Sequence, residues 1–293
     1  MIELSSPLQT PVGWAILRPE SGYYVRIPAR ILRGSQAARG GDRVRSVPCR
    51  SSGRRAVTAI DRVAASALPA ETLYDARRSV YYPKPVLRGW LHVLWFGASL
   101  IACPVLVVRG HGASSSTALA VYALSVIGLF GVSALYHRGR WTPAWNRRLQ
   151  RLDHMMIFLL IAGTATPVFL MAARGAFGVT CLIVLWVLTL SAAAIHLAWM
   201  HAPELLVGAT FVGLGSLAAL ALPAVWVHAG VGPGVLILVG GLLYIAGALS
   251  YHRRKPDPFP AVFGYHEVFH ACVCAAASCQ FLAIALFIGR VGG

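Results

Sequence analysis

The chain has 293 residues and a net charge of +16, and it is 57% hydrophobic but only 12% charged. Soluble domains usually carry about 25% charged residues, so this composition excludes an ordinary soluble protein. The positive charge does not indicate nucleic-acid binding, because 15 of the 26 Lys and Arg residues lie within residues 1–88 and the rest fall largely between apolar segments.

Residues 1–80 form a basic leader rich in Arg, Ser, Gly and Ala, without the apolar stretch of a secretory signal. We expect this segment to be disordered, because it has little apolar surface to offset chain entropy. Two alternatives stay open: attraction of its arginines to anionic lipid headgroups, and a start codon assigned too far upstream. A transmembrane domain over residues 81–293 is predicted to follow.

Seven runs of about 20 apolar residues make up that domain, each long enough to cross a hydrocarbon core about 30 Å thick. The runs are continuous rather than alternating, which favours helices over the strands of a barrel. They cover residues 89–108, 116–137, 152–172, 177–199, 204–226, 232–252 and 265–288. We therefore predict an all-α polytopic membrane protein, a bundle of seven transmembrane helices.

Loop charges predict the direction in which these helices cross, since Lys and Arg in short loops favour the cytoplasmic side. With the N-terminus inside, the inner segments near residues 77–88, 138–151 and 253–255 carry twelve Lys and Arg, and the outer segments carry three. We expect a cytoplasmic N-terminus and an outside C-terminus, in an inner or plasma membrane of bacterial type.

Polar side chains within the predicted helices gather in three clusters. Ser133 and His137 end the second helix, Asp153 and His154 begin the third, and His266, Glu267 and His270 begin the seventh. The predicted directions place all three clusters at the cytoplasmic level. Because loop charges alone set those directions, this agreement in depth is an independent indication of one functional site.

Helix geometry makes these clusters a candidate zinc site. His266 and His270 lie one turn apart on the same face, about 5–6 Å apart at Cβ. With His137 they supply the three nitrogens of a catalytic zinc centre whose fourth position stays open for water. Asp153 is placed to hydrogen-bond to that water or to orient a ligand.

The remaining histidines, cysteines and glycines receive structural interpretations. His92, His196, His201 and His252 are expected to be packed or interfacial. Five of the six cysteines lie in apolar runs and no Cys-x-x-Cys pair occurs, so we predict neither disulfides nor a Cys-based metal site. Six glycines are expected to permit close helix packing, at Gly208, Gly213, Gly215, Gly240, Gly241 and Gly247.

The segment from His266 to His270 is also a His-Glu-x-x-His sequence, in which a metalloprotease would use Glu267 as general base. Two features oppose that interpretation. The 23 residues after His270 contain no Asp, Glu or His that would complete a protease site. Glu267 also points about 100° around the helix from His266, toward water or basic loops rather than the metal.

These motifs resemble the hemolysin III branch of the progestin and adipoQ receptor superfamily, which is related to alkaline ceramidases. The resemblance rests on Ser133-Ala-Leu-Tyr-His137, on Leu152-Asp153-His154 with the apolar segment that ends at Pro167, and on Gly264-Tyr265-His266 with His270. It covers about residues 80–290. It implies a zinc ion held by the three histidines, with Asp153 near the zinc-bound water and Ser133 lining the site.

Two functions fit these expectations. The first is a zinc-dependent hydrolase of a membrane lipid, for which the family resemblance suggests an amide lipid such as ceramide. Asp153 would act as general base, and Ser133 would donate a hydrogen bond to the developing oxyanion. The alternative is a non-catalytic sensor, lipid-homeostasis factor or channel-like, cytolytic protein with a structural zinc. We expect membrane lipids as partners and name no protein partner.

Overall fold

The computed structural model describes residues 14–17, 25–28, 72–75, 80–173, 175–199 and 202–291. The chain divides into two units, Met1–Lys84 and Pro85–Gly293. His201, which was expected to be packed or interfacial, lies outside the described residues, as does Cys49.

The first unit contains four short strands in its described part. Strand β1 (Trp14–Leu17) pairs antiparallel with β2 (Val25–Pro28), and β3 (Thr72–Asp75) pairs antiparallel with β4 (Val80–Pro83). Composition did not lead us to expect these two hairpins. The rest of the predicted leader lies outside the described residues.

The second unit is helical, as predicted, and its described residues include seven helical segments long and apolar enough to cross a membrane. These segments are α3 (Trp90–Val108), α4 (Ala113–Arg138), α5 (Pro143–Met171), α6 (Ala176–Ala198), α7 (Glu204–Ala218) with its continuation to Ala229, α9 (Val231–Arg253) and α10 (Tyr265–Val291). The fold-class prediction is therefore confirmed for the membrane part of the chain.

Two helices differ from the hydropathy pattern. The fifth segment is not one regular helix: α7 gives way to the 3-10 turn η1 (Ala219–Ala221) and then to α8 (Leu222–Ala229). Pro223 lies in the first turn of α8 and has no N–H to continue the hydrogen-bond ladder. Helix α5 begins nine residues before the predicted residue 152, because the Thr142 side chain caps it and Pro143 occupies its first position.

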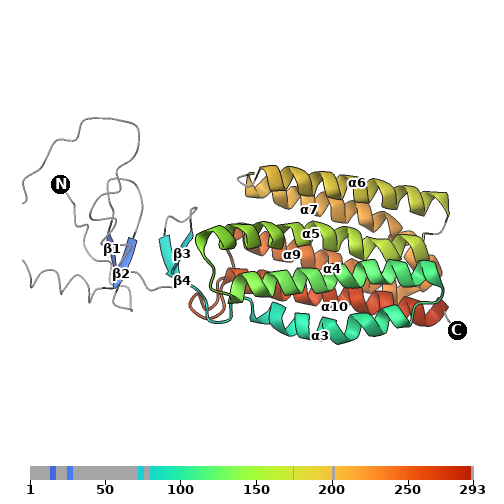
Figure 1. The fold of residues 1–293 in the computed structure, drawn as a ribbon, viewed down its shortest axis with the longest axis horizontal. Coiled ribbons are helices and arrows are strands. Elements are labelled where there is room, and N and C mark those ends of the chain that lie inside the picture. Colours follow the sequence, from blue (N-terminus) through green and yellow to red (C-terminus); the bar gives the residue numbers. More distant parts are fainter. Residues whose placement is uncertain are drawn as a thin grey trace, which may run out of the picture. The chain divides into compact units, whose positions relative to one another are not determined.

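The helices of this unit run side by side, with α6 and α7 along one edge and α3 along the opposite edge (Figure 1). Helices α4 and α5 have the largest buried share of their membrane spans and contribute more core residues than any other helix, including Phe130 and Phe158. The last helix, α10, packs against α9 and reaches back to α3. The polar ends of helices distant in sequence therefore come close together.

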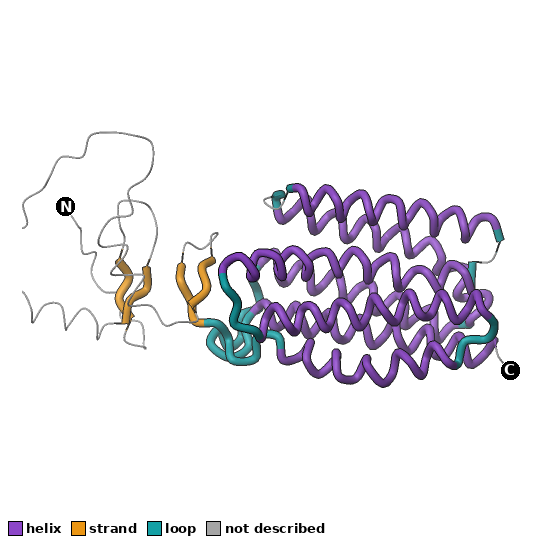
Figure 2. The backbone as a smooth tube through the Cα atoms, viewed as in Figure 1, coloured by secondary structure: helices purple, strands orange, loops and turns teal. Residues whose placement is uncertain are grey.

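The segment before α3, the α4–α5 loop and the α9–α10 loop gather at one end of the bundle (Figure 2). Two backbone hydrogen bonds join the segment before α3 to the α9–α10 loop. Val86 N–H donates to Ala261 O at 3.1 Å, and Leu87 N–H donates to Val262 O at 3.0 Å. The first and last membrane helices are thus tied together beside the ends that carry the predicted site.

The glycine prediction is right at two positions and wrong at four. A Cβ at Gly240 would lie 3.1 Å from Ala276 O, and one at Gly247 would lie 2.9 Å from Cys272 Cβ, so both let α9 approach α10 closely. A Cβ added at any of the other four glycines would meet no atom within 4 Å apart from its chain neighbours and the backbone of its own helix. These glycines are Gly208, Gly213, Gly215 and Gly241. The sequence did not reveal which glycines face another helix.

Candidate metal centre

The structure brings together the three histidines that the sequence placed at one membrane depth. His137 lies in the last turn of α4, and His266 and His270 lie in the first two turns of α10. The His137 ring centroid is 4.9 Å from each of the other two, which are 4.5 Å apart. One ring nitrogen of each histidine lies within 4.8 Å of the others.

Local hydrogen bonds fix where α10 begins, and so where its two histidines point. Glu267, three residues after Gly264, accepts the Gly264 N–H at 2.9 Å, as the acidic residue of a capping box does. Asp257 accepts the Tyr265 N–H at 3.0 Å. These bonds satisfy two N–H groups that a helix start leaves without intrahelical partners.

Gly89, at the start of α3, lets the first membrane helix approach the site. Its φ of +82° lies in the left-handed region, which favours glycine. An added Cβ would lie 2.7 Å from His137 Cβ. The Cβ of His137 is therefore packed directly against the start of α3.

The donor set fits a metal ion. His266 Nε2 and His270 Nδ1 are buried, and neither has a hydrogen-bond partner within the part of the chain that the structure describes. A buried polar atom left without a partner costs about 1–3 kcal/mol. A cation bound by neutral imidazoles would satisfy these nitrogens, and three histidines with an open fourth position are a common zinc-binding set.

Asp153 and Ser133 lie beside the three histidines. Asp153 Oδ2 is 3.9 Å from His137 Nε2. Ser133 lies one turn before His137 on α4 and is buried. All five residues predicted for the site therefore lie in one place.

Glu267 does not face the three-histidine group. Its Oε1 forms a buried ion pair with Nε of Arg88, the residue that precedes Gly89, while its Oε2 accepts the Gly264 N–H. Both carboxylate oxygens are thus engaged away from the histidines. The basic partner expected from the helix geometry is Arg88, and this arrangement opposes a protease with Glu267 as general base.

Sequence reasoning missed His92, which belongs to this site rather than to general packing. It lies in the first turn of α3, stacks on His270 with ring centroids 3.8 Å apart, and places Nδ1 2.8 Å from Ser133 Oγ. A usable indication was present in the sequence. The predicted direction of the first helix puts residue 92 at the same depth as the three clusters.

His154 and His196 form a separate pair. His154 Nδ1 is 3.2 Å from His196 Nε2, across the interface between α5 and α6. His154 therefore turns away from the three-histidine group, although it directly follows Asp153. His196 is buried and packed, as predicted.

Comparison with known proteins decides the family. The model of the haemolysin-III-related family matches residues 80–281, which is more than half of the chain and includes every site residue named above. The chain belongs to the haemolysin-III-related family.

Two curated relatives agree with this assignment. Hemolysin-3 of Bacillus cereus is 28% identical over 216 residues, 72% of this chain and 95% of that protein. A Hemolysin-3 homolog of Bacillus subtilis (strain 168) is 27% identical over 143 residues, 49% of this chain and 64% of that protein.

The haemolysin-III match begins near the boundary between the two units and ends within α10, so the family region is the membrane bundle with its three-histidine group. No solved structure matches the chain at a significant level.

Proposed function

We propose that this haemolysin-III-related protein is a zinc-dependent hydrolase of a membrane lipid. The observation that carries the proposal is a buried group of three histidines with ligand atoms within 4.8 Å and a carboxylate 3.9 Å from one of them. A zinc ion in such a site lowers the pKa of a bound water to about 7 and polarises a carbonyl or phosphoryl oxygen.

The other residues have roles that follow from their positions. His137, His266 and His270 are the ligands, held by two helices whose ends are fixed by local bonds. Asp153 Oδ2 takes up the proton released from water, because it lies beside the ligand set without being part of it. The Ser133 hydroxyl, one turn from His137 on α4, donates a hydrogen bond to an oxygen that gains negative charge during the reaction.

A lipid amide is the proposed substrate class. The site lies near one end of seven membrane-spanning segments, where the headgroup region of a bilayer would meet them. A lipid in that position presents its amide or ester linkage near the site, with its acyl chains along the apolar helix surfaces. The amide is preferred because of the resemblance to ceramidases, and an ester panel tests that preference.

The test combines metal content and lipid hydrolysis on one purified sample. Native protein should contain about one zinc per chain and cleave an amide lipid from a panel of amide and ester lipids. His270→Ala should lose both properties. His228→Ala, an exposed histidine at the end of α8, should keep both and is the matched control. Zinc-loaded native protein that cleaves no member of the panel would refute the hydrolase proposal.

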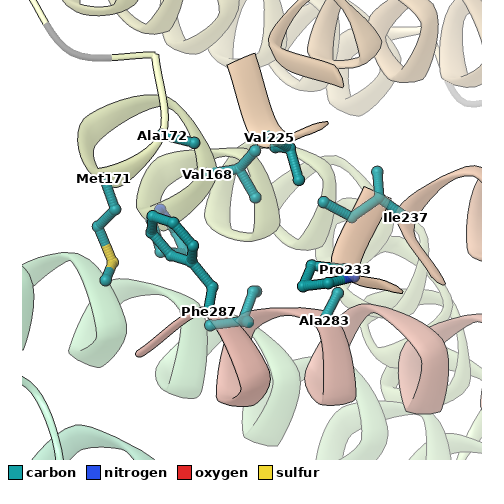
Figure 3. Close-up of a pocket in the computed structure, with 10 residues that line it drawn as sticks. Val168, Met171, Ala172, Val225, Pro233, Ile237, Ala283 and Phe287 are labelled. Carbon is teal, nitrogen blue, oxygen red and sulfur yellow. The ribbon is translucent and has the colours of Figure 1, made fainter. Parts of the chain in front are cut away.

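The second candidate is a non-catalytic membrane protein with a structural zinc. The structure also has a small apolar pocket in the other half of the bundle. This pocket is lined by side chains of α5, α8, α9 and α10, such as Val168, Val225 and Phe287, and it contains none of the site residues (Figure 3). Ala283 in its wall lies about 20 Å along α10 from His270, at 1.5 Å per residue.

Asp153→Ala separates the two candidates. A hydrolase would keep its zinc and lose turnover, because only the proton acceptor is removed. A protein with a structural zinc would keep both its zinc and its cellular function. Zinc content and thermal stability of the variant should match the native protein in either case, so the functional readout decides.

A further inference from the structure

His92 has contacts to two different parts of the site. Its ring stacks on His270 with centroids 3.8 Å apart and planes 15° apart, and Phe130 packs edge-on against it at 5.1 Å. Its Nδ1 is 2.8 Å from Ser133 Oγ. One imidazole from the first membrane helix therefore contacts a ligand on the last helix and a hydroxyl on the second.

The contact to Ser133 restrains the orientation of the His92 ring. His92 Nδ1 and Ser133 Oγ are 2.8 Å apart, a hydrogen-bond distance, and either group can be the donor because a neutral imidazole has two tautomers. This hydrogen bond joins α3 to α4 one turn before His137, and so it restrains the ring that stacks on His270.

The second ring nitrogen argues against a role in packing alone. His92 Nε2 is buried and lacks a hydrogen-bond partner among the described residues. A phenylalanine would fill the same space against Phe130 and His270 without burying a polar atom, so an imidazole here is costly unless its Nδ1 is used.

We infer that His92 is a positioning residue of the metal centre, which holds the His270 ring by stacking and is itself held by the hydrogen bond between its Nδ1 and Ser133 Oγ. This inference rests on the metal centre proposed above. Residues that orient the ligands of a metal site typically change metal affinity or activity by 10- to 100-fold when they are replaced.

Two substitutions separate the two contacts. His92→Phe keeps a ring against His270 and removes the bond to Ser133. His92→Asn keeps a polar nitrogen or oxygen near the position of Nδ1 and removes the stacked ring. Ser133→Ala removes the same hydrogen bond from its other end, so His92→Phe/Ser133→Ala completes a double-mutant cycle.

The readout is Co²⁺ affinity of the full-length protein in detergent, measured by competition with a coloured chelator. His92→Asn should bind Co²⁺ at least tenfold more weakly than native protein. His92→Phe and Ser133→Ala should each weaken binding by about three- to tenfold, and the double variant should bind no more weakly than His92→Phe alone. His228→Asn, outside the site, should bind as native protein does.

Two results would overturn the inference alone. In the first, the Co²⁺ affinity of His92→Asn is within threefold of that of native protein while His270→Ala abolishes binding. In the second, the fold-loss of Co²⁺ affinity in the double variant equals the product of the fold-losses in the two single variants. Native protein that binds Co²⁺ no better than His270→Ala would refute the proposed metal centre and this inference together. If His92→Asn does not fold, as judged by size-exclusion chromatography, the cycle between His92→Phe and Ser133→Ala decides.

Discussion

Replacing Glu267 by Gln should destabilise the bundle without removing a metal ligand. Glu267 is 1% exposed and is paired with Arg88, which is 5% exposed, so both charges are buried. Glutamine can still accept the Gly264 N–H, because the residue at this position of a capping box is either Glu or Gln. The substitution therefore removes one charge and leaves Arg88 buried without its counter-charge.

The expected magnitude follows from burial. Removing one partner of a buried ion pair costs about 3–5 kcal/mol, whereas an exposed pair contributes about 0–1 kcal/mol. The chain offers a matched control in Glu204, which is 44% exposed in its pair with Arg254 at 3.5 Å. One kcal/mol shifts Tm by about 2–4 °C in a chain of 150–250 residues. Glu267→Gln should therefore lower Tm by about 6–20 °C, and Glu204→Gln by about 4 °C at most.

Thermal unfolding in detergent can be followed with a thiol-reactive fluorescent dye, because the described cysteines are free and Cys103 is fully buried. Arg88→Met combined with Glu267→Gln should recover part of the lost stability, since no unpaired charge then stays buried. The reasoning would be refuted if Glu267→Gln lowered Tm no more than Glu204→Gln does. Loss of lipid hydrolysis by Glu267→Gln with native Tm and metal content would instead make Glu267 a candidate general base.

Four further predictions follow from the structure. Gly89→Ala should weaken Co²⁺ binding at least tenfold and lower Tm, because its Cβ would lie 2.7 Å from His137 Cβ at a φ of +82°. Gly241→Ala, in the interior of α9 with open space around the new methyl group, should instead stabilise the protein by about 0.5–1 kcal/mol in thermal unfolding. Removal of zinc by a chelator should lower Tm, and re-addition should restore it, because only the folded state holds all three histidines together. A membrane-impermeant maleimide should label a cysteine introduced at His111 in intact cells but not one at Arg140; the opposite pattern would reverse the proposed orientation.

The main features of the fold could be predicted because membranes restrict the choices strongly. Apolar length alone indicates seven helices, and loop arginines indicate their direction. The direction places His137, Asp153 and His266 at one depth, so a three-dimensional site follows from a one-dimensional pattern. The structure agrees in bringing these side chains together.

Features that depend on lateral packing could not be predicted in the same way. Hydropathy gives the depth of a residue but not the neighbour it faces, so it could not distinguish Gly247, packed on Cys272, from Gly241 in open space. The Arg88–Glu267 pair joins residues 179 positions apart, and no local motif links the two. His92 was at the right depth, but its stacking on His270 became visible only when α3 and α10 were placed together.

The distribution of the three histidines along the chain has a consequence for biosynthesis. One ligand lies on the second membrane helix and two lie on the last, so the complete set exists only after the final helix has entered the bilayer. A nascent or truncated chain that ends before residue 265 would hold only His137 of the three. Metal retention would therefore distinguish fully inserted molecules from incomplete ones, and the centre would add its binding energy at the last stage of assembly.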